Sequence, residues 1–278
     1  MPERKSLLCP NCRKLISADE PKCPYCGLAR PRLHNMAGII RNIFIFNPIL
    51  TIIYINIAFY VVALLLNPSG LFSGGGLFSF LSPSSQSLFL LGATGTYPVF
   101  GFGRYWSLIS ASFLHGGILH LGFNMMALYQ LGPFVLRVFG FHRFFVIYIL
   151  TGIAGFAVSL VFGVDFTIGA SASICGLIGA IAYYGKNRGG EFGQAIYKQA
   201  LVWIVAIIVF GLVVPSINNW AHGGGVISGI GLAMLMGYAE KKEETANQKL
   251  MAYVCIVVTL GVLVWSVLSS LLFALSRL

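Results

Sequence analysis

The sequence predicts an all-α polytopic membrane protein of seven transmembrane spans, preceded by a small cysteine-rich module. Three observations predict this class. Of the 278 residues, 57% are hydrophobic and only 9% are charged, and the mean hydropathy is +0.84. The charges are unevenly spaced, which leaves apolar runs of about 20 residues, the length that crosses a bilayer as a helix. Four of the six cysteines crowd into the first 26 residues.

The cysteine-rich module covers residues 1–30. Cys9 and Cys12 form one Cys-x-x-Cys knuckle, and Cys23 and Cys26 form a second. Because two knuckles can present four thiolates to one tetrahedral ion, we expect a structural Zn²⁺ in a short zinc ribbon. A redox dithiol and metal-free cysteines are the alternatives. Four thiolates close the coordination sphere, so this zinc is not expected to be catalytic.

The role of this module is left open by the sequence. A module this small has no sizeable apolar core and would depend on its metal to fold. It could bind a protein partner on the inner side of the membrane, bind nucleic acid, or only add stability. A basic linker, residues 31–42, follows it. The polar N-terminus has no apolar h-region, so we expect no cleavable signal peptide.

Seven apolar runs follow the linker, and each is a predicted span. They are Ile43–Leu66, Leu114–Leu136, Phe144–Phe162, Gly169–Tyr184, Ala200–Val214, His222–Tyr238 and Met251–Leu275. Between the first two lies Asn67–Arg104, which is rich in Gly, Ser and Pro and is interrupted by Leu-Phe pairs. This composition predicts an interfacial loop that lies partly in the bilayer surface.

The basic residues orient the spans. With the N-terminus inside, sixteen of the eighteen Lys and Arg residues fall in inner segments, and only Arg104 and Arg277 fall outside. This is a positive-inside pattern, and it predicts a cytoplasmic N-terminus and an outer C-terminus. It also accounts for most of the net charge of +10, so the lipid bilayer is the expected partner and no nucleic acid is required.

Five polar residues share one depth at the outer side. Ser171 begins the fourth span, His222 begins the sixth, and His115, His120 and Asn124 lie at the outer end of the second. Polar and ionisable groups in a membrane are costly, so such a group of side chains predicts a functional site. Serine with histidine is the minimum for nucleophilic acyl chemistry, in which the imidazole takes the hydroxyl proton and the oxygen attacks a carbonyl.

Small residues predict that the serine and histidine helices pack closely. In the sixth span they recur every four residues at Gly225, Gly229, Ala233 and Gly237, and in the fourth at Ser171, Cys175 and Gly179. Small residues at this spacing let helix backbones approach, which would bring Ser171 to His222. The alternative is that the glycines only serve packing and that the Ser171 hydroxyl bonds back to its own helix.

The second span offers donors for a developing negative charge. His120 and Asn124 are one helical turn apart on one face, and each can donate a hydrogen bond. Donors aimed at the oxyanion of acyl transfer contribute about 3 kcal/mol each, and the N–H of Ser171 at a helix N-terminus would add to them. The alternative for His120 and Asn124 is a polar network that only ties helices together.

Three further polar residues are weaker candidates for the site or lie outside it. Ser173 lies about 160–200° round the helix from Ser171, which makes it a weak candidate nucleophile. Asp165 is an acid in an outer segment that could orient His222, but nothing in the sequence places it there. His142, beside Arg143, is expected to be solvated.

Three stretches carry a family resemblance. They are W-S-L-I-S-A-S-F-L-H-G-G-I-L-H-L-G-F-N-M-M from Trp106, G-A-S-A-S-I-C-G-L-I-G-A from Gly169 and A-H-G-G-G-V-I-S-G from Ala221. In order and spacing they resemble the three signatures of rhomboid intramembrane serine proteases. The resemblance implies a rhomboid-like six-helix core over residues 43–240. Residues 241–278 would add an inner loop and one extra C-terminal transmembrane helix.

The resemblance also implies roles for the five polar residues. Ser171 would be the nucleophile and His222 the base of a dyad without aspartate, while His120 and Asn124 would line the oxyanion site with His115 nearby. It implies a serine endopeptidase that hydrolyses transmembrane segments of membrane proteins near their outer ends. No cofactor is required for that chemistry, and a prokaryotic plasma membrane is the expected location.

The chain departs from the family pattern at two positions. Ala172 follows Ser171 where the family usually has glycine, which keeps the backbone N–H but costs some backbone freedom. Ser107 follows Trp106 where the family usually has arginine, and Arg104 is displaced from that position. The alternatives to a protease are an inactive rhomboid-like chaperone that binds transmembrane clients and a small-molecule channel or transporter.

Overall fold

The computed structural model describes residues 6–9, 14–17, 20–29, 47–67, 81–214 and 216–276. The chain divides into two compact units, Met1–Tyr54 and Ile55–Leu278. Cys12, the predicted linker 31–42 and the first four residues of the first predicted span lie outside the described residues.

The first unit contains a β-hairpin. Strand β1 (Ser6–Leu8) pairs antiparallel with β2 (Leu15–Ser17), and the N–H of Cys9 continues the ladder by donating to the carbonyl of Lys14 at 2.9 Å. A second turn closes when the N–H of Gly27 donates to the carbonyl of Cys23 at 2.9 Å. Gly27 has a φ of +74°, a left-handed conformation that glycine adopts without a steric penalty.

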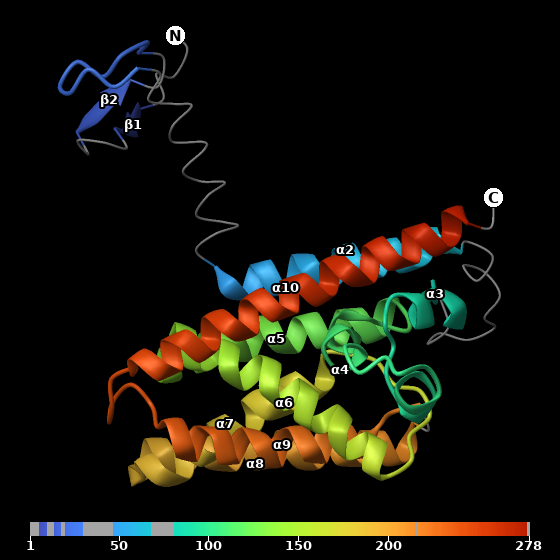
Figure 1. Ribbon diagram of the computed structural model, residues 1–278. Helices are drawn as coiled ribbons and strands as arrows, with labels where there is room; N and C mark the ends of the chain where they lie inside the picture. Colours follow the sequence, from blue (N-terminus) through green and yellow to red (C-terminus); the bar gives the residue numbers. More distant parts are fainter. Residues whose placement is uncertain are drawn as a thin grey trace. The chain divides into compact units, whose positions relative to one another are not determined.

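Among the described residues, seven long helices follow, each overlapping one predicted span (Figure 1). They are α2 (Pro48–Leu66), α5 (Ile118–Phe139), α6 (Phe141–Val161), α7 (Ser171–Arg188), α8 (Gly190–Val213), α9 (Asn219–Met236) and α10 (Ala246–Leu275). Within the same residues α2, α6, α8 and α10 are long and apolar enough to cross a membrane. Short α3 (Ser85–Leu90) and α4 (Ser107–Ser110) lie between α2 and α5.

Helix α7 occupies the centre of the bundle. Every residue from Ala172 to Ala182 is buried, because α9, α8, α6 and α5 all pack against it. Figure 1 shows α6 crossing α7 and α9, with α10 on the far side of α6. By contrast, α8 buries only Gly193 and Ala200, so most of its apolar surface faces outward. Helix α7, which contains many small residues, is thus enclosed by four other helices.

Glycines hold α7 and α9 in backbone contact, as the spacing of small residues predicts. A methyl group on Gly225 would lie 2.2 Å from the carbonyl oxygen of Ala172, and one on Gly229 would lie 2.0 Å from that of Gly176. A methyl group on Gly179 would lie 2.2 Å from the carbonyl oxygen of Val226. Side chains larger than hydrogen do not fit between these backbones.

Replacing Gly229 by alanine is therefore expected to destabilise the bundle. The new methyl group would meet backbone that cannot turn aside, and overpacking of this kind costs about 1–3 kcal/mol. Gly231→Ala is the matched control, because nothing lies within 4 Å of the added methyl group. Thermal unfolding in detergent micelles measures both variants. Equal melting temperatures would contradict the close contact.

The long helices do not begin where the predicted spans begin, and glycines explain two of the differences. Helix α5 begins at Ile118, four residues after Leu114, because the Gly116-Gly117 pair separates His115 from it. Helix α8 begins at Gly190 instead of Ala200. Gly189 and Gly190 have φ values of +70° and +66° and turn the chain directly from α7 into α8. The first turns of α8 contain polar residues, so a prediction from hydropathy places the start of this helix too late.

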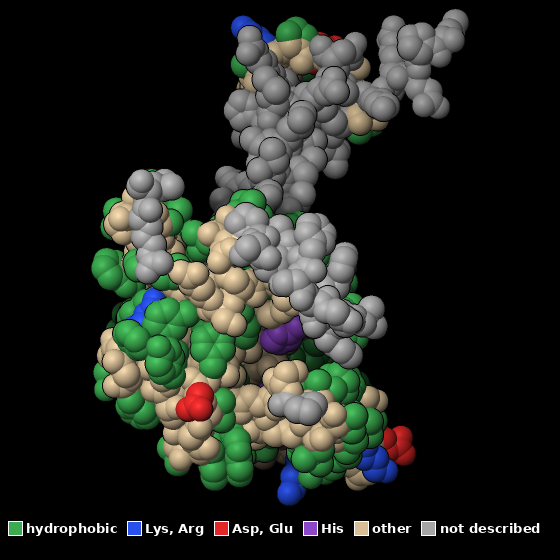
Figure 2. All heavy atoms as spheres, turned by 90° about the vertical axis from the view of Figure 1, so that its right-hand side faces the viewer, with side chains coloured by type: hydrophobic (Ala, Val, Ile, Leu, Met, Phe, Trp, Pro, Cys, Tyr) green, Lys and Arg blue, Asp and Glu red, His purple; other side chains and the backbone are tan. Residues whose placement is uncertain are grey.

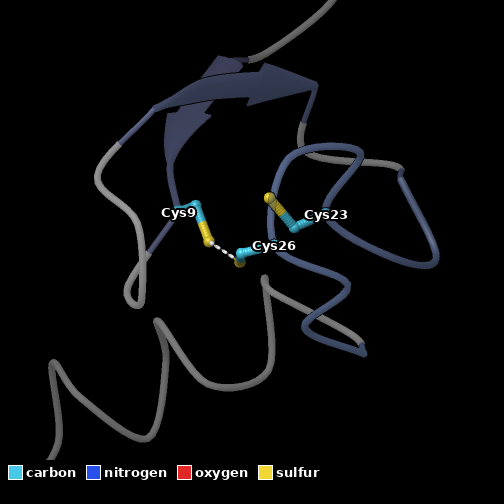
Figure 3. A group of neighbouring side chains, drawn as sticks. All are labelled: Cys9, Cys23 and Cys26. Atoms are coloured by element: carbon cyan, nitrogen blue, oxygen red, sulfur yellow. Dashed lines mark hydrogen bonds between the residues drawn. The ribbon is translucent and has the colours of Figure 1, made fainter.

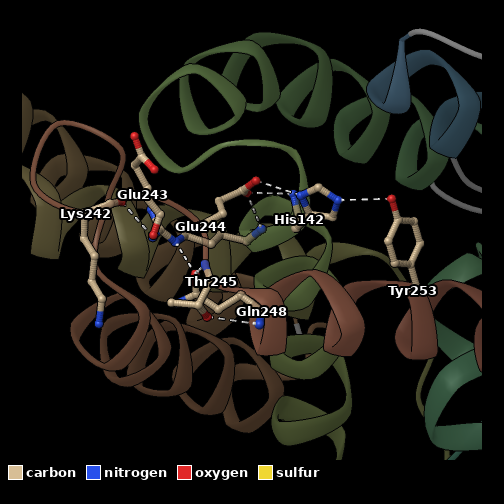
Figure 4. Close-up of polar contacts among 8 residues, drawn as sticks. His142, Lys242, Glu243, Glu244, Thr245, Gln248 and Tyr253 are labelled. Atoms are coloured by element: carbon tan, nitrogen blue, oxygen red, sulfur yellow. Dashed lines mark hydrogen bonds and ion pairs between the residues drawn. The ribbon is translucent and has the colours of Figure 1, made fainter.

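A polar cluster lies at the end of the bundle where α6 and α10 begin (Figure 4). Its centre is Arg143, which has no exposed surface. Its Nε donates to Oε1 of Gln248 at 3.0 Å, and its Nη2 donates to the carbonyls of Lys242 at 2.8 Å and Glu243 at 2.7 Å. Gln248 in turn donates to the carbonyl of Met236 at 3.0 Å. The loop between α9 and α10 is thus fastened to the start of α6.

The expectation that His142 is solvated is wrong. Its Nδ1 lies 2.7 Å from Oε2 of Glu244, and its Nε2 lies 3.4 Å from the hydroxyl of Tyr253. Burial by itself raises the pKa of the Glu244 carboxyl. The hydrogen bonds from the His142 side chain and from the N–H groups of Arg143 and His142 outweigh that effect and leave the pKa below its ordinary value. The partner sits 102 residues away in the sequence, so His142 gave no local signal of it.

Candidate active site

Ser171 and His222 meet at the opposite end of the bundle. Ser171 is the first residue of α7, and His222 lies in the first turn of α9. The distance from Nε2 of His222 to Oγ of Ser171 is 2.9 Å, a hydrogen bond. The imidazole is 7% exposed. The backbone contact between the two helices sets this distance, since it places their first turns side by side.

The hydrogen bond to Ser171 indicates which nitrogen of the neutral His222 ring carries the proton. If the Ser171 hydroxyl donates to Nε2, the neutral imidazole carries its proton on Nδ1. Among the described residues, Nδ1 is buried without a hydrogen-bond partner. Asp165 is therefore not its partner, and the Asp165 carboxylate accepts from the hydroxyl of Thr96 at 2.6 Å. In the described part of the chain, the pair therefore stands without a carboxylate.

His120 lies beside the pair, and a hydrogen bond to its ring indicates which of its nitrogens can donate. The backbone N–H of Gly116 donates to Nδ1 of His120 at 3.3 Å. A ring that accepts at Nδ1 is neutral and carries its proton on Nε2. A methyl group on Gly169 would lie 2.8 Å from this Nε2 and 3.7 Å from Oγ of Ser171. Gly169, which has a φ of +125°, leaves open the space between the two atoms.

Asn124 and His115 both contact His120. Nδ2 of Asn124 donates to the carbonyl of His120 at 3.1 Å, which leaves its second amide hydrogen for another acceptor. His115 is fully buried, and its ring centroid lies 5.0 Å from that of His120 in a T-shaped contact. The structure thus brings Ser171, His222 and His120 together, with Asn124 held by the backbone of His120 and His115 by its ring.

Ser173 and Ala172 face away from the pair. Ser173 is fully buried, and its Oγ would lie 2.4 Å from a methyl group on Gly152. The hydroxyl therefore points toward α6. Ala172 is also fully buried, and its Cβ would lie 2.9 Å from a methyl group on Gly155. Gly155 on α6 thus leaves room for the methyl group of Ala172. Rhomboid proteases, which this stretch resembles, usually have glycine at the position of Ala172.

Arg104 and Ser107 anchor the loop that precedes α5. The guanidinium of Arg104 donates to the carbonyls of Phe89 and Leu90, the latter at 2.8 Å, and lies 4.6 Å from the ring centroid of Trp106. The buried hydroxyl of Ser107 donates to Oγ1 of Thr94 at 3.0 Å. Arg104 and Ser107 thus hold the loop in place by hydrogen bonds, although neither is an arginine directly after Trp106.

The site region is hollowed. Figure 2 looks onto the end of the helical unit that carries α3, and it shows a histidine side chain in a recess between apolar side chains. An apolar cavity of about 220 Å³ also adjoins His222, lined by Cys175 of α7 and by residues of α8 and α9. Sequence reasoning missed this cavity, because it depends on how α8 leans against α7.

Three of the four predicted zinc ligands lie together (Figure 3). The Sγ atoms of Cys9, Cys23 and Cys26 all lie within 4.8 Å of one another, and those of Cys9 and Cys26 are 3.6 Å apart. Two thiolates on one tetrahedral zinc, with Zn–S bonds of about 2.3 Å, are about 3.8 Å apart. The three sulfurs therefore fit one Zn²⁺. Cys12 lies outside the described residues.

We expect purified protein to carry one equivalent of zinc per chain and to lose it in Cys23→Ser. Thiolates supply the coordination, and a module of this size folds around its metal. Cys175→Ser is the control, since that thiol is buried in α7. Elemental analysis measures the zinc, and limited proteolysis reports folding of residues 1–30. Zinc-free wild type with an intact module would contradict this expectation.

The comparisons with known proteins agree with the motifs. A family model described as Rhomboid domain matches residues 103–239. The chain is 38% identical over 135 residues to the Rhomboid protease GluP of Bacillus subtilis (strain 168), covering 49% of this chain and 27% of that protein. It is 31% identical over 202 residues to RHOMBOID-like protein 4 of Arabidopsis thaliana, covering 65% of this chain and 50% of that protein.

RHOMBOID-like protein 2 of Arabidopsis thaliana is 30% identical over 194 residues, which cover 66% of this chain and 61% of that protein. The chain thus spans 27% to 61% of the length of these three relatives. All five residues of the candidate site, from His115 to His222, lie inside the matched region 103–239. Over this region the chain is thus similar to rhomboid domains and to a rhomboid protease.

Proposed function

We propose that this chain is a rhomboid-type intramembrane serine endopeptidase, which cleaves transmembrane segments of membrane proteins near their outer ends. Ser171 is the nucleophile and His222 the general base. The observation that carries the proposal is the 2.9 Å hydrogen bond between Nε2 of His222 and Oγ of Ser171. It joins two helices that begin at the same end of the bundle, so it is not a back-bond of a serine to its own helix.

The first half-reaction forms an acyl-enzyme. As Oγ of Ser171 attacks the peptide carbonyl carbon, its proton passes to Nε2 of His222. The carbonyl oxygen becomes an oxyanion, to which the Nε2–H of His120 and the second amide hydrogen of Asn124 would donate. One such donor contributes about 3 kcal/mol to the transition state. His222 then gives its proton to the leaving amine, and the peptide bond breaks.

The second half-reaction releases the product. Water attacks the ester carbonyl while His222 takes its proton. The ester bond to Ser171 then breaks, and His222 returns the proton to Oγ of Ser171, which gives a carboxylic acid and the free hydroxyl. Asn124 and His115 line the polar route along which water would reach the ester. No cofactor takes part in either half-reaction.

The proposed topology places the dyad on the outer side of a membrane. With seven spans, the positive-inside pattern supports a cytoplasmic N-terminus and an outer C-terminus. The proposed location is a prokaryotic plasma membrane. The four-cysteine zinc ribbon then lies inside, where it would meet a partner of its own. Its zinc is structural, because four thiolates leave no open position.

A reporter with one transmembrane segment tests the proposal. The segment carries small and helix-breaking residues near its outer end, and it is reconstituted with the enzyme in liposomes. Mass spectrometry of the fragments should place a single cut at that end with wild type, and none with Ser171→Ala. A client-binding chaperone would instead copurify with intact reporter in both forms. A channel would keep its solute flux in both forms.

A further inference from the structure

The residue that connects the two halves of the dyad is Asn218, which precedes α9. Its Oδ1 accepts the N–H of Ala221 at 3.0 Å, and its carbonyl accepts the N–H of His222 at 3.2 Å. These two bonds form the first turn of α9. Asn218 therefore caps the helix turn that carries the proposed base.

The amide nitrogen of Asn218 reaches two other elements. Nδ2 donates to Oγ of Ser159 on α6 at 2.8 Å and to Oγ1 of Thr167 at 3.1 Å. Ser159 is fully buried and Thr167 is 8% exposed. An amide group has two hydrogens and one oxygen, so every hydrogen of this side chain has a partner. These hydrogen bonds fix the side-chain amide of Asn218 in one position.

Thr167 belongs to the segment that leads into Ser171. Its N–H and carbonyl pair with those of Thr94 at 2.7 and 3.1 Å, and the N–H of Gly169 donates to the carbonyl of Ala111 at 2.8 Å. The main chain before the nucleophile is thus held on one side by the loop that precedes α5. Asn218 holds it on the other side and ties it to the helix of His222.

We propose that Asn218 is a positioning residue of the protease, which sets the separation of Ser171 and His222 through its bond to Thr167. This inference rests on the proposed function. Neither Asn218 nor Thr167 touches the reacting atoms, and both act by fixing the chain on each side of the dyad. A displacement of about 1 Å between catalytic groups can reduce a rate about 100-fold, so the tie bears directly on turnover.

Two variants separate positioning from helix capping. Thr167→Val removes the hydroxyl that accepts from Asn218 and leaves the cap intact. Asn218→Ser keeps an oxygen suited to an N-cap but is too short to reach Ser159 and Thr167. Thr96→Val is the matched control, because it removes a hydroxyl of the loop paired with the same segment, and that hydroxyl donates to the exposed Asp165.

The experiment measures kcat and KM for the reporter in liposomes, the rate of labelling by a fluorophosphonate, and the melting temperature. Thr167→Val and Asn218→Ser should each lower kcat and the labelling rate about 10- to 100-fold, with KM unchanged and with melting temperatures close to that of Thr96→Val. An active wild type with Thr167→Val as fast as Thr96→Val would overturn the inference alone. A wild type that neither labels nor cleaves would overturn the proposed function and this inference with it.

Discussion

Ser171→Ala is expected to reduce cleavage of the reporter by about 10⁴-fold or more. Loss of the hydroxyl removes the atom that forms the acyl-enzyme, and nothing else in the site takes its place. His222→Ala should cause a loss of the same size, because the serine is not deprotonated without its base. The double variant should be no slower than either single variant, since residues that act as a unit are not additive.

Ser173→Ala is the matched control for this prediction. It removes a hydroxyl two residues further along the same helix, where the side chain is fully buried and directed toward Gly152. Its cleavage rate should stay within a few-fold of wild type. Cleavage that survives in Ser171→Ala and disappears in Ser173→Ala would show that the nucleophile is assigned to the wrong serine.

Arg143→Ala is expected to have the largest effect on stability. The guanidinium donates three hydrogen bonds from a fully buried position, and bonds to a charged group contribute about 1.5–3 kcal/mol each. The variant leaves two carbonyls and a glutamine amide oxygen without this donor. We expect the free energy of unfolding to fall by about 3 kcal/mol or more. Arg143→Lys should rescue it poorly, because an ammonium lacks the planar fork that reaches these acceptors.

Arg137→Ala is the control for the effect of removing an arginine. Arg137 lies in the last turn of α5 and is exposed, and surface substitutions change stability by about 0.5 kcal/mol or less. Denaturant unfolding in mixed micelles measures the three variants side by side. If Arg143→Ala and Arg137→Ala unfold at the same midpoint, the buried network does not stabilise the fold as its hydrogen bonds indicate.

Local sequence patterns predict much of the fold of this protein. Apolar runs predict each long helix, and the four-residue spacing of Gly225 and Gly229 predicts that α9 lies against α7. Both features depend on residues close in the chain, which a hydropathy or spacing pattern records. The start of α8 was misplaced because its first turns are polar and follow a glycine turn, so the apolar run begins later than the helix does.

Partners far apart in the sequence could not be predicted. The contact of His142 with Glu244 joins residues 102 apart, and a histidine next to an arginine looks like any solvated pair. Asn218 gave no signal because a neutral amide before a helix is ordinary. Only the meeting of α6, α9 and the segment before α7 gives its nitrogen two acceptors. The location of the apolar cavity beside His222 likewise depends on packing.

The most direct test of the account is covalent labelling of detergent-solubilised protein with a fluorophosphonate, followed by mass spectrometry. An activated serine attacks phosphorus and displaces fluoride, so the adduct marks the nucleophile without any knowledge of the substrate. We expect one adduct per chain on the peptide that contains Ser171, present in Ser173→Ala and absent in Ser171→Ala and His222→Ala. Folded wild type that takes no label, or takes it on another serine, would show that Ser171 is not an activated nucleophile.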